Sequence, residues 1–202
     1  MTKPSLILAS ASAVRATLLK GAGLAFEIVD SRLDEDALKE GFAGREGADE
    51  TDMLALKLAE EKARAVSQRH PAAFVIGADQ ILSCEGRRYD KPRSMEEARA
   101  NLQAFRGRPH ILHSGVALAA NDVVIWRHAA QAHLTMRDFS DTFLDEYLAN
   151  AGEKVMKSVG CYQLEGPGVQ LFEQIEGDYF TILGLPLLPL LAELRRHGVV
   201  TP

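Results

Sequence analysis

The apolar run Phe74-Val75-Ile76-Gly77-Ala78-Asp79-Gln80 constrains the fold more than any other stretch of this sequence. Its β-branched and aromatic residues, with Pro71 before them, predict a strand that is buried on both faces, as in an α/β sheet. The strand would end on Asp79. At that edge of an α/β sheet ligands bind, and a carboxylate there can hold a metal ion or accept a proton from water. The alternative is an aspartate that only caps a turn.

A second candidate site lies near the start of the chain. Ser5 to Ala9 predict a buried strand and Ala13 to Ala22 a helix, with Ser10-Ala11-Ser12 between them. A serine N-cap leaves N–H groups of the first helical turn free, and the helix dipole makes that end positive. Arg15 would add a guanidinium group there, which indicates an anion site without the pattern of a Walker loop. The alternative is a plain cap with a solvated Arg15.

Two lysines could add positive charge to these sites. Lys62 lies at the edge of the apolar stripe of a helix predicted from Thr51 to Arg69, so its ammonium group either follows the core or reaches water. Lys91 precedes Pro92, which favours an extended backbone at the lysine. A hairpin is predicted from Ile81 to Tyr89, and its return strand should bring Lys91 close to Asp79.

The sequence indicates candidate metal ligands less clearly than it indicates the anion site. Asp34-Glu35-Asp36 is an acidic cluster after a short strand predicted from Phe26 to Val29. Such a cluster is either solvated or, if it lies near the anion site at Ser10 to Arg15, able to supply a metal ligand. His110 and His113 are three residues apart on a predicted strand, hence on opposite faces, so we expect structural or solvent-facing roles for them rather than a shared metal.

Apolar periodicity and turn signals predict a helical and stranded scaffold for the rest of the chain. Helices should begin after the caps Ser94 and Ser140, and residues 41–50 should form a loose loop. No repeat, low-complexity tract or linker interrupts the sequence, so residues 1–202 are expected to form one domain. A hairpin is expected whose first strand is 81–84 and whose return strand ends at Tyr89. Further strands are expected at 110–118, 123–136, 160–166, 169–175 and 179–183. A last helix is expected from Gly184-Leu185-Pro186 to Gly198.

The composition limits the function further. With 202 residues, 47% of them hydrophobic, the chain can bury a sizeable core. A net charge of −5 argues against binding nucleic acid, which requires a basic face, so any phosphate should belong to a small molecule. The two cysteines form no disulfide framework, and no run has the length of a signal peptide or membrane span. A cytoplasmic protein without membrane contact is therefore expected.

Six short motifs follow one another along the chain: Ser10-x-Ser12-x-x-Arg15, Glu35, Leu58 to Ala63, Gly77-Ala78-Asp79, Lys91-Pro92 and Gly184-Leu185-Pro186. In this order they resemble the Maf family of nucleoside triphosphate pyrophosphatases, over nearly the whole chain. The resemblance implies an elongated mixed β-sheet flanked by helices, with a cleft between two lobes, as in inosine triphosphate pyrophosphatase. It also implies a house-cleaning hydrolase of nucleotide metabolism that converts a triphosphate to monophosphate and pyrophosphate with Mg²⁺ or Mn²⁺, and allows a homodimer.

The resemblance implies catalytic and binding roles for the residues at matching positions. Asp79 becomes the proton acceptor for the attacking water, and Glu35 and Asp79 become metal ligands. The chemistry is consistent, because phosphoanhydride hydrolysis needs charge neutralisation on several oxygens, an in-line water and one base. The residues implied around the triphosphate are Ser10, Ser12, Arg15, Lys62 and Lys91.

Three positions bear on the choice of base, namely Val14, Gln80 and Glu165. They depart from the dTTP/UTP-directed subgroup and are similar to the subgroup that acts on 7-methyl-GTP. A buried Glu165 could accept hydrogen bonds from the N1–H and amino group of guanine and would favour the charge of a 7-methylated ring. The segment from Glu176 to Phe180 is closer to the pyrimidine-directed members, so a dTTP/UTP pyrophosphatase stays open.

Two functions of other kinds are also open. The family has been linked to septum formation, so the chain could be a nucleotide-binding regulator without turnover, although Asp79, Lys62 and Lys91 favour an enzyme. A nonspecific phosphatase would release orthophosphate instead of pyrophosphate.

Overall fold

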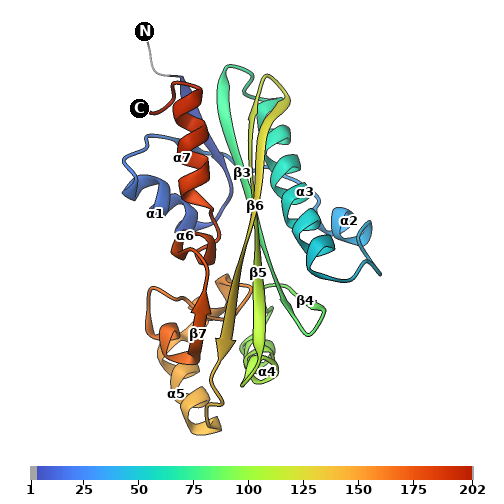
Figure 1. The fold of residues 1–202 in the computed structure, drawn as a ribbon, viewed down its shortest axis with the longest axis vertical. Helices are drawn as coiled ribbons and strands as arrows, with labels where there is room; N and C mark the ends of the chain where they lie inside the picture. The colour runs from blue at the N-terminus through green and yellow to red at the C-terminus, as the bar shows by residue number, and fades with distance from the viewer. Residues whose placement is uncertain (1–3, 202) are drawn as a thin grey trace.

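One seven-stranded mixed sheet runs along the length of the molecule (Figure 1). The structure, a computed structural model, describes residues 4–201. The strand order is β2-β1-β3-β5-β6-β7, with β4 paired to β3; β1 is parallel to β2 and β3, and the other pairs are antiparallel. The predicted α/β class is confirmed. The strands are β1 Ser5–Ala9, β2 Glu27–Ile28, β3 Ala73–Cys84, β4 Arg87–Tyr89, β5 Pro109–Ala120, β6 Val123–Met136 and β7 Phe172–Glu176.

Helices cover the sheet differently at its two ends, which gives two lobes (Figure 1). In one lobe α3 packs on one face of the sheet, while α1 and α7 pack on the other through a core that includes Leu8, Leu19 and Leu190. In the other lobe α4 and α5 surround a second core that includes Phe105 and Leu134. The helices are α1 Ala13–Gly21, α2 Glu35–Glu40, α3 Ala48–Ser67, α4 Met95–Phe105, α5 Asp141–Ala151, α6 Tyr179–Ile182 and α7 Leu187–Arg196, with the 3-10 helices η1 Gly152–Lys157 and η2 Pro167–Leu171. Among residues 4–201, no helix combines the length and apolar character needed to cross a bilayer.

Serine caps begin three helices as predicted. The side chains of Ser12, Ser94 and Ser140 accept hydrogen bonds from the backbone N–H three residues later. These bonds satisfy N–H groups that have no partner inside the helix. Local sequence therefore determines where α1, α4 and α5 begin.

The predicted end of the central strand at Asp79 is wrong. Strand β3 continues through Asp79 to Cys84, so the apolar run and the first arm of the predicted hairpin are one strand of 12 residues. Strand β1 ends opposite Gly77, and β4 pairs only from Leu82 onward. Asp79 is thus positioned by the end of its neighbour β1, where β3 has no strand partner on that side.

Two other segments differ from their predictions. The stretch 41–50 is not one loop, because α3 begins at Ala48, and α2, which ends at Glu40, was not predicted. The tail was predicted as three strands, of which only β7 forms. Tyr179–Ile182 is helical because Asp178 caps it by accepting hydrogen bonds from the N–H and hydroxyl of Thr181.

Two glycines allow α3 to lie directly on the sheet. A Cβ atom at Gly77 would overlap the carbonyl oxygen of Ala59, and one at Gly115 would overlap that of Ala55. The backbone of α3 therefore approaches β3 and β5 more closely than any side chain on these strands would allow. This approach places residues of α3 next to the middle of β3.

We expect Gly77→Ala to destabilise the protein by about 3 kcal/mol or more, because the added methyl group overlaps backbone that cannot move without shifting α3. Urea unfolding at neutral pH measures the effect. Gly21→Ala is the matched control, since a Cβ there meets nothing within 4 Å, and its free energy of unfolding should change by less than about 1 kcal/mol. Equal stability of the two variants would contradict the close packing.

Candidate active site

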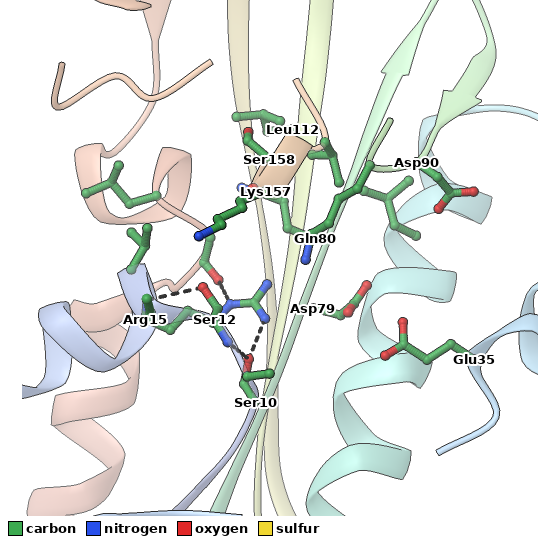
Figure 2. A pocket seen from close by; sticks show the side chains of 18 of the residues that line it. Ser10, Ser12, Arg15, Glu35, Asp79, Gln80, Asp90, Leu112, Lys157 and Ser158 are labelled. Atoms are coloured by element: carbon green, nitrogen blue, oxygen red, sulfur yellow. Dashed lines mark hydrogen bonds between the residues drawn. The ribbon is translucent and has the colours of Figure 1, made fainter. Parts of the chain in front are cut away.

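A cleft of about 760 Å³ lies between the two lobes, and its lining includes every residue predicted for the site. Figure 2 shows this cleft from close by. One wall comes from the end of β1, the start of α1 and the segment between α6 and α7. The other comes from η1 and the segment that follows it, with the middle of β3 between the two walls. The predicted residues on its lining are Ser10, Ser12, Val14, Arg15, Glu35, Lys62, Asp79, Gln80, Lys91 and Glu165.

The ammonium group of Lys62 joins the two candidate metal ligands. Its Nζ lies 2.5 Å from Oδ1 of Asp79 and 2.8 Å from Oε1 of Glu35. The Lys62 and Asp79 side chains are only 9% and 12% exposed, so each charge is balanced by its partner rather than by water. Lys62 therefore follows the core, and the alternative of a lysine that reaches water is excluded. Within residues 4–201 no group of three or more acidic, histidine or cysteine side chains forms a ready metal site.

Arg15 is a buried connector rather than a solvated side chain. Its Nε donates to the carbonyl oxygen of Gly184 at 2.7 Å, and its Nη1 donates to Ser10 Oγ at 2.9 Å and to the carbonyl oxygen of Ala78 at 2.8 Å. Burial lowers the pKa of Arg15, and the negative charge of Asp79 opposes that shift. Its Nη2 donates to no protein atom in the described part of the chain and remains available to an anion.

Lys91 provides a cation with no fixed partner. No carboxylate lies within 4 Å of its ammonium group among the residues described. Partial burial in the cleft lowers the pKa of Lys91, and the positive charge of Arg15 lowers it further. A bound anion would offset both effects, which suits Lys91 to hold phosphate.

The three residues predicted to select the base lie in different surroundings. The Nε2 of Gln80 donates to Ser114 Oγ and the Thr181 carbonyl at 3.0 Å each, so this amide is held in place by the fold. Glu165 is exposed, and the prediction of a buried carboxylate is wrong, because it lies in the turn before η2 instead of in a strand. Val14 is half-buried on the first turn of α1.

Comparison with known proteins identifies the family. A family model described as "Maf-like protein" matches residues 5–197. The chain belongs to the Maf-like protein family. A protein of Rhizobium meliloti (strain 1021) named 7-methyl-GTP pyrophosphatase is 53% identical over 98% of each chain. One of Brucella suis biovar 1 (strain 1330) with the same name is 51% identical over 96% of this chain and 97% of its own.

Two further matches carry less information about the base. A protein of Granulibacter bethesdensis named nucleoside triphosphate pyrophosphatase is 50% identical over 97% of this Maf-like chain and 98% of its own. A crystal structure of nucleoside-triphosphatase / dITP/XTP pyrophosphatase from Mycobacterium abscessus has 12% identity and a TM-score of 0.37, over 96% of this chain and 95% of that one. That structural similarity is too low to support an argument.

The sequence did not point to residues 156–159, which form part of the cleft wall of this Maf-like protein. Lys157 is the last residue of η1, and its side chain enters the cleft (Figure 2). The stretch lacks helical or strand periodicity. Two lysines three residues apart, Lys154 and Lys157, are the only signal that the sequence offers there.

His110 and His113 are both buried, so of the two expected roles, structural or solvent-facing, the structure favours the structural one. His113 lies between Asp52 Oδ1 at 2.7 Å and Ser83 Oγ at 2.8 Å. His110 Nε2 lies 2.8 Å from the hydroxyl of Tyr162, a residue of the cleft lining, while its Nδ1 has no partner in residues 4–201. Burial lowers the pKa of His110 to about 4.

The folded-state pKa of His110 is below the ordinary value of 6.5. As the pH falls, His110 is therefore protonated in the unfolded chain at a higher pH than in the folded protein. This contribution to stability is complete above pH 6.5 and is lost as pH falls toward 4, to a total of about 3 kcal/mol. Urea unfolding at pH 7 and pH 4.5 should show the loss, and His110→Gln should reduce it. His133→Gln, at an exposed position on β6, is the control. An unchanged pH dependence in His110→Gln would contradict the assignment.

Proposed function

We propose that this protein hydrolyses a nucleoside triphosphate to the monophosphate and pyrophosphate. The observation that carries the proposal is the position of the Asp79 carboxylate, buried beside Lys62 in a cleft that the cations Arg15 and Lys91 also line. The names of relatives that are about half identical over nearly their whole length support the same reaction.

In the proposed mechanism Asp79 accepts the proton of the attacking water. Arg15 Nη2 and Lys91 hold phosphate oxygens and neutralise the charge that develops during cleavage. Ser10 Oγ accepts hydrogen bonds from Arg15 and from the Ser12 backbone, so its own proton is free to donate to a phosphate. Because Arg15 is already fixed by Gly184 and Ala78, little reorganisation is needed when the substrate binds.

Glu35 and Asp79 would hold the divalent cation. The donor set fits, because both carboxylates already converge on one positive charge, that of Lys62. Mg²⁺ is commonly bound by one or two carboxylates together with substrate phosphates, so two acidic ligands suffice. When bound, the ion would neutralise charge on the phosphate oxygens.

We further propose 7-methyl-GTP as the substrate. Two of the relatives named above carry that activity in their names. In this chain Glu165 places a carboxylate on the cleft lining, where it can pair with the positively charged 7-methylguanine ring. The exposed position of Glu165 leaves it accessible to a base that enters from solvent.

The remaining proposals concern the protein as a whole. We propose that residues 1–202 act as one catalytic domain, because the cleft draws on both lobes of the sheet. A cytoplasmic location fits a nucleotide substrate, and assembly as a homodimer stays a prediction that light scattering can test.

Asp79→Asn should lower kcat by at least about 100-fold while nucleotide binding persists, because the amide keeps the shape of the carboxylate but accepts no proton. The assay measures pyrophosphate and orthophosphate released from 7-methyl-GTP, GTP, UTP and dTTP with Mg²⁺ or Mn²⁺. Asp36→Asn, at an exposed acid of the same cleft, is the control and should retain activity. Orthophosphate as the first product would indicate a phosphatase. Binding without any turnover by the wild type would indicate a regulator.

Glu165→Gln should lower kcat/KM for 7-methyl-GTP by roughly ten- to hundredfold, the range expected for loss of a charged hydrogen bond. Activity on UTP and dTTP should stay the same or rise, since selectivity is a ratio of kcat/KM values. Glu173→Gln, on β7 and outside the cleft lining, serves as the control. An equal fall on every base would exclude a base-selecting role for Glu165.

A further inference from the structure

Lys157 enters the active-site cleft from the lobe opposite α1. It is exposed, it ends η1, and Figure 2 shows its ammonium group directed toward Ser12 and Arg15. Among the residues that the structure describes, no carboxylate lies within 4 Å of this ammonium group. This cationic side chain points across the cleft without an acidic partner, so it is available to an anion in the cleft.

The wall that Lys157 faces is also positive. The backbone N–H groups of Ala13 and Val14 are the first of α1 and have no acceptor within residues 4–201, and the first turn of that helix contains no acid. The Nη2 of Arg15, a side chain only 9% exposed, also lacks a protein acceptor in the described chain. Donors from two lobes thus converge on one volume of the cleft.

Two acidic residues of the cleft are already paired with another cation. Asp79 and Glu35 are both held by Lys62. Figure 2 shows these two carboxylates on the other side of the cleft from Lys157. Cations on opposing walls of a cleft repel one another unless an anion lies between them, and the repulsion is stronger in a partly buried cleft than in water. The arrangement is therefore suited to a polyanion.

We propose that Lys157 is a further substrate-binding residue, which holds the phosphate chain of the nucleotide from the second lobe against Arg15 and the start of α1. This inference rests on the proposed function. Lys157 would bind the phosphates because they are the only anionic part of a nucleoside triphosphate, whereas the base is neutral or, when 7-methylated, positive. Bound phosphate would then link the two lobes.

The test compares Lys157→Met with Lys154→Met, a lysine of the same 3-10 helix that does not line the cleft. Calorimetry with inorganic pyrophosphate and with the nucleoside 7-methylguanosine separates phosphate contacts from base contacts. We expect Lys157→Met to weaken pyrophosphate binding about tenfold and to reduce its salt dependence. Lys154→Met and Lys157→Arg should bind pyrophosphate nearly as the wild type does, and 7-methylguanosine binding should not change.

Unchanged pyrophosphate affinity in Lys157→Met would overturn the proposal. A loss confined to 7-methylguanosine would also overturn it, because Lys157 would then contact the base. An equal loss for both ligands with a lower melting temperature would show a structural role and overturn it as well. If the wild type releases no pyrophosphate from any triphosphate, the proposed function fails, but the anion-binding measurement remains decisive for Lys157.

Discussion

The ion pair between Lys62 and Asp79 is the interaction on which the rest of the site depends. It brings a helix and the middle strand together at a point where both charges are nearly out of water. Such a pair persists only if its geometry is held by the surrounding fold, since an unpaired buried charge costs several kcal/mol. The absence of a side chain at Gly77 supplies that geometry, because it lets α3 approach β3. Glu35, the first residue of α2, binds the same ammonium group.

Arg15 performs a comparable task on the opposite side of β3. Its guanidinium group fills the position beside Ala78 where β1 has ended, and so satisfies a carbonyl group that would otherwise lack a strand partner. The same group reaches Gly184, 169 residues away in sequence. Two buried cations therefore hold the middle of β3 from its two sides. A site arranged in this way before substrate arrives can stabilise developing charge without reorganising.

Much of the site could be predicted from the sequence, because the motifs that carry its chemistry are local. The cap at Ser12 and the acid at Asp79 were recognised in this way, and the predicted family is confirmed. Contacts between distant segments were not predictable. Nothing near Arg15 indicates that Gly184 is its acceptor, and the apolar residues after Asp178 suit a strand as well as the helix that the cap produces. The apolar residues between Gly160 and Gly166 predict a strand, whereas Glu165 lies in a turn before η2 and is exposed.

The lobes are joined by strands rather than by a linker. Strands β3, β5 and β6 pass from one hydrophobic core into the other without interruption, so that Ile76 and Leu82 of a single strand belong to different cores. A hinge of a few loop residues is therefore absent from these three connections. Widening of the cleft through these three strands would require a small change in the twist of the sheet, shared among many backbone hydrogen bonds. The sheet would then resist this change elastically and return to its original twist when the products leave.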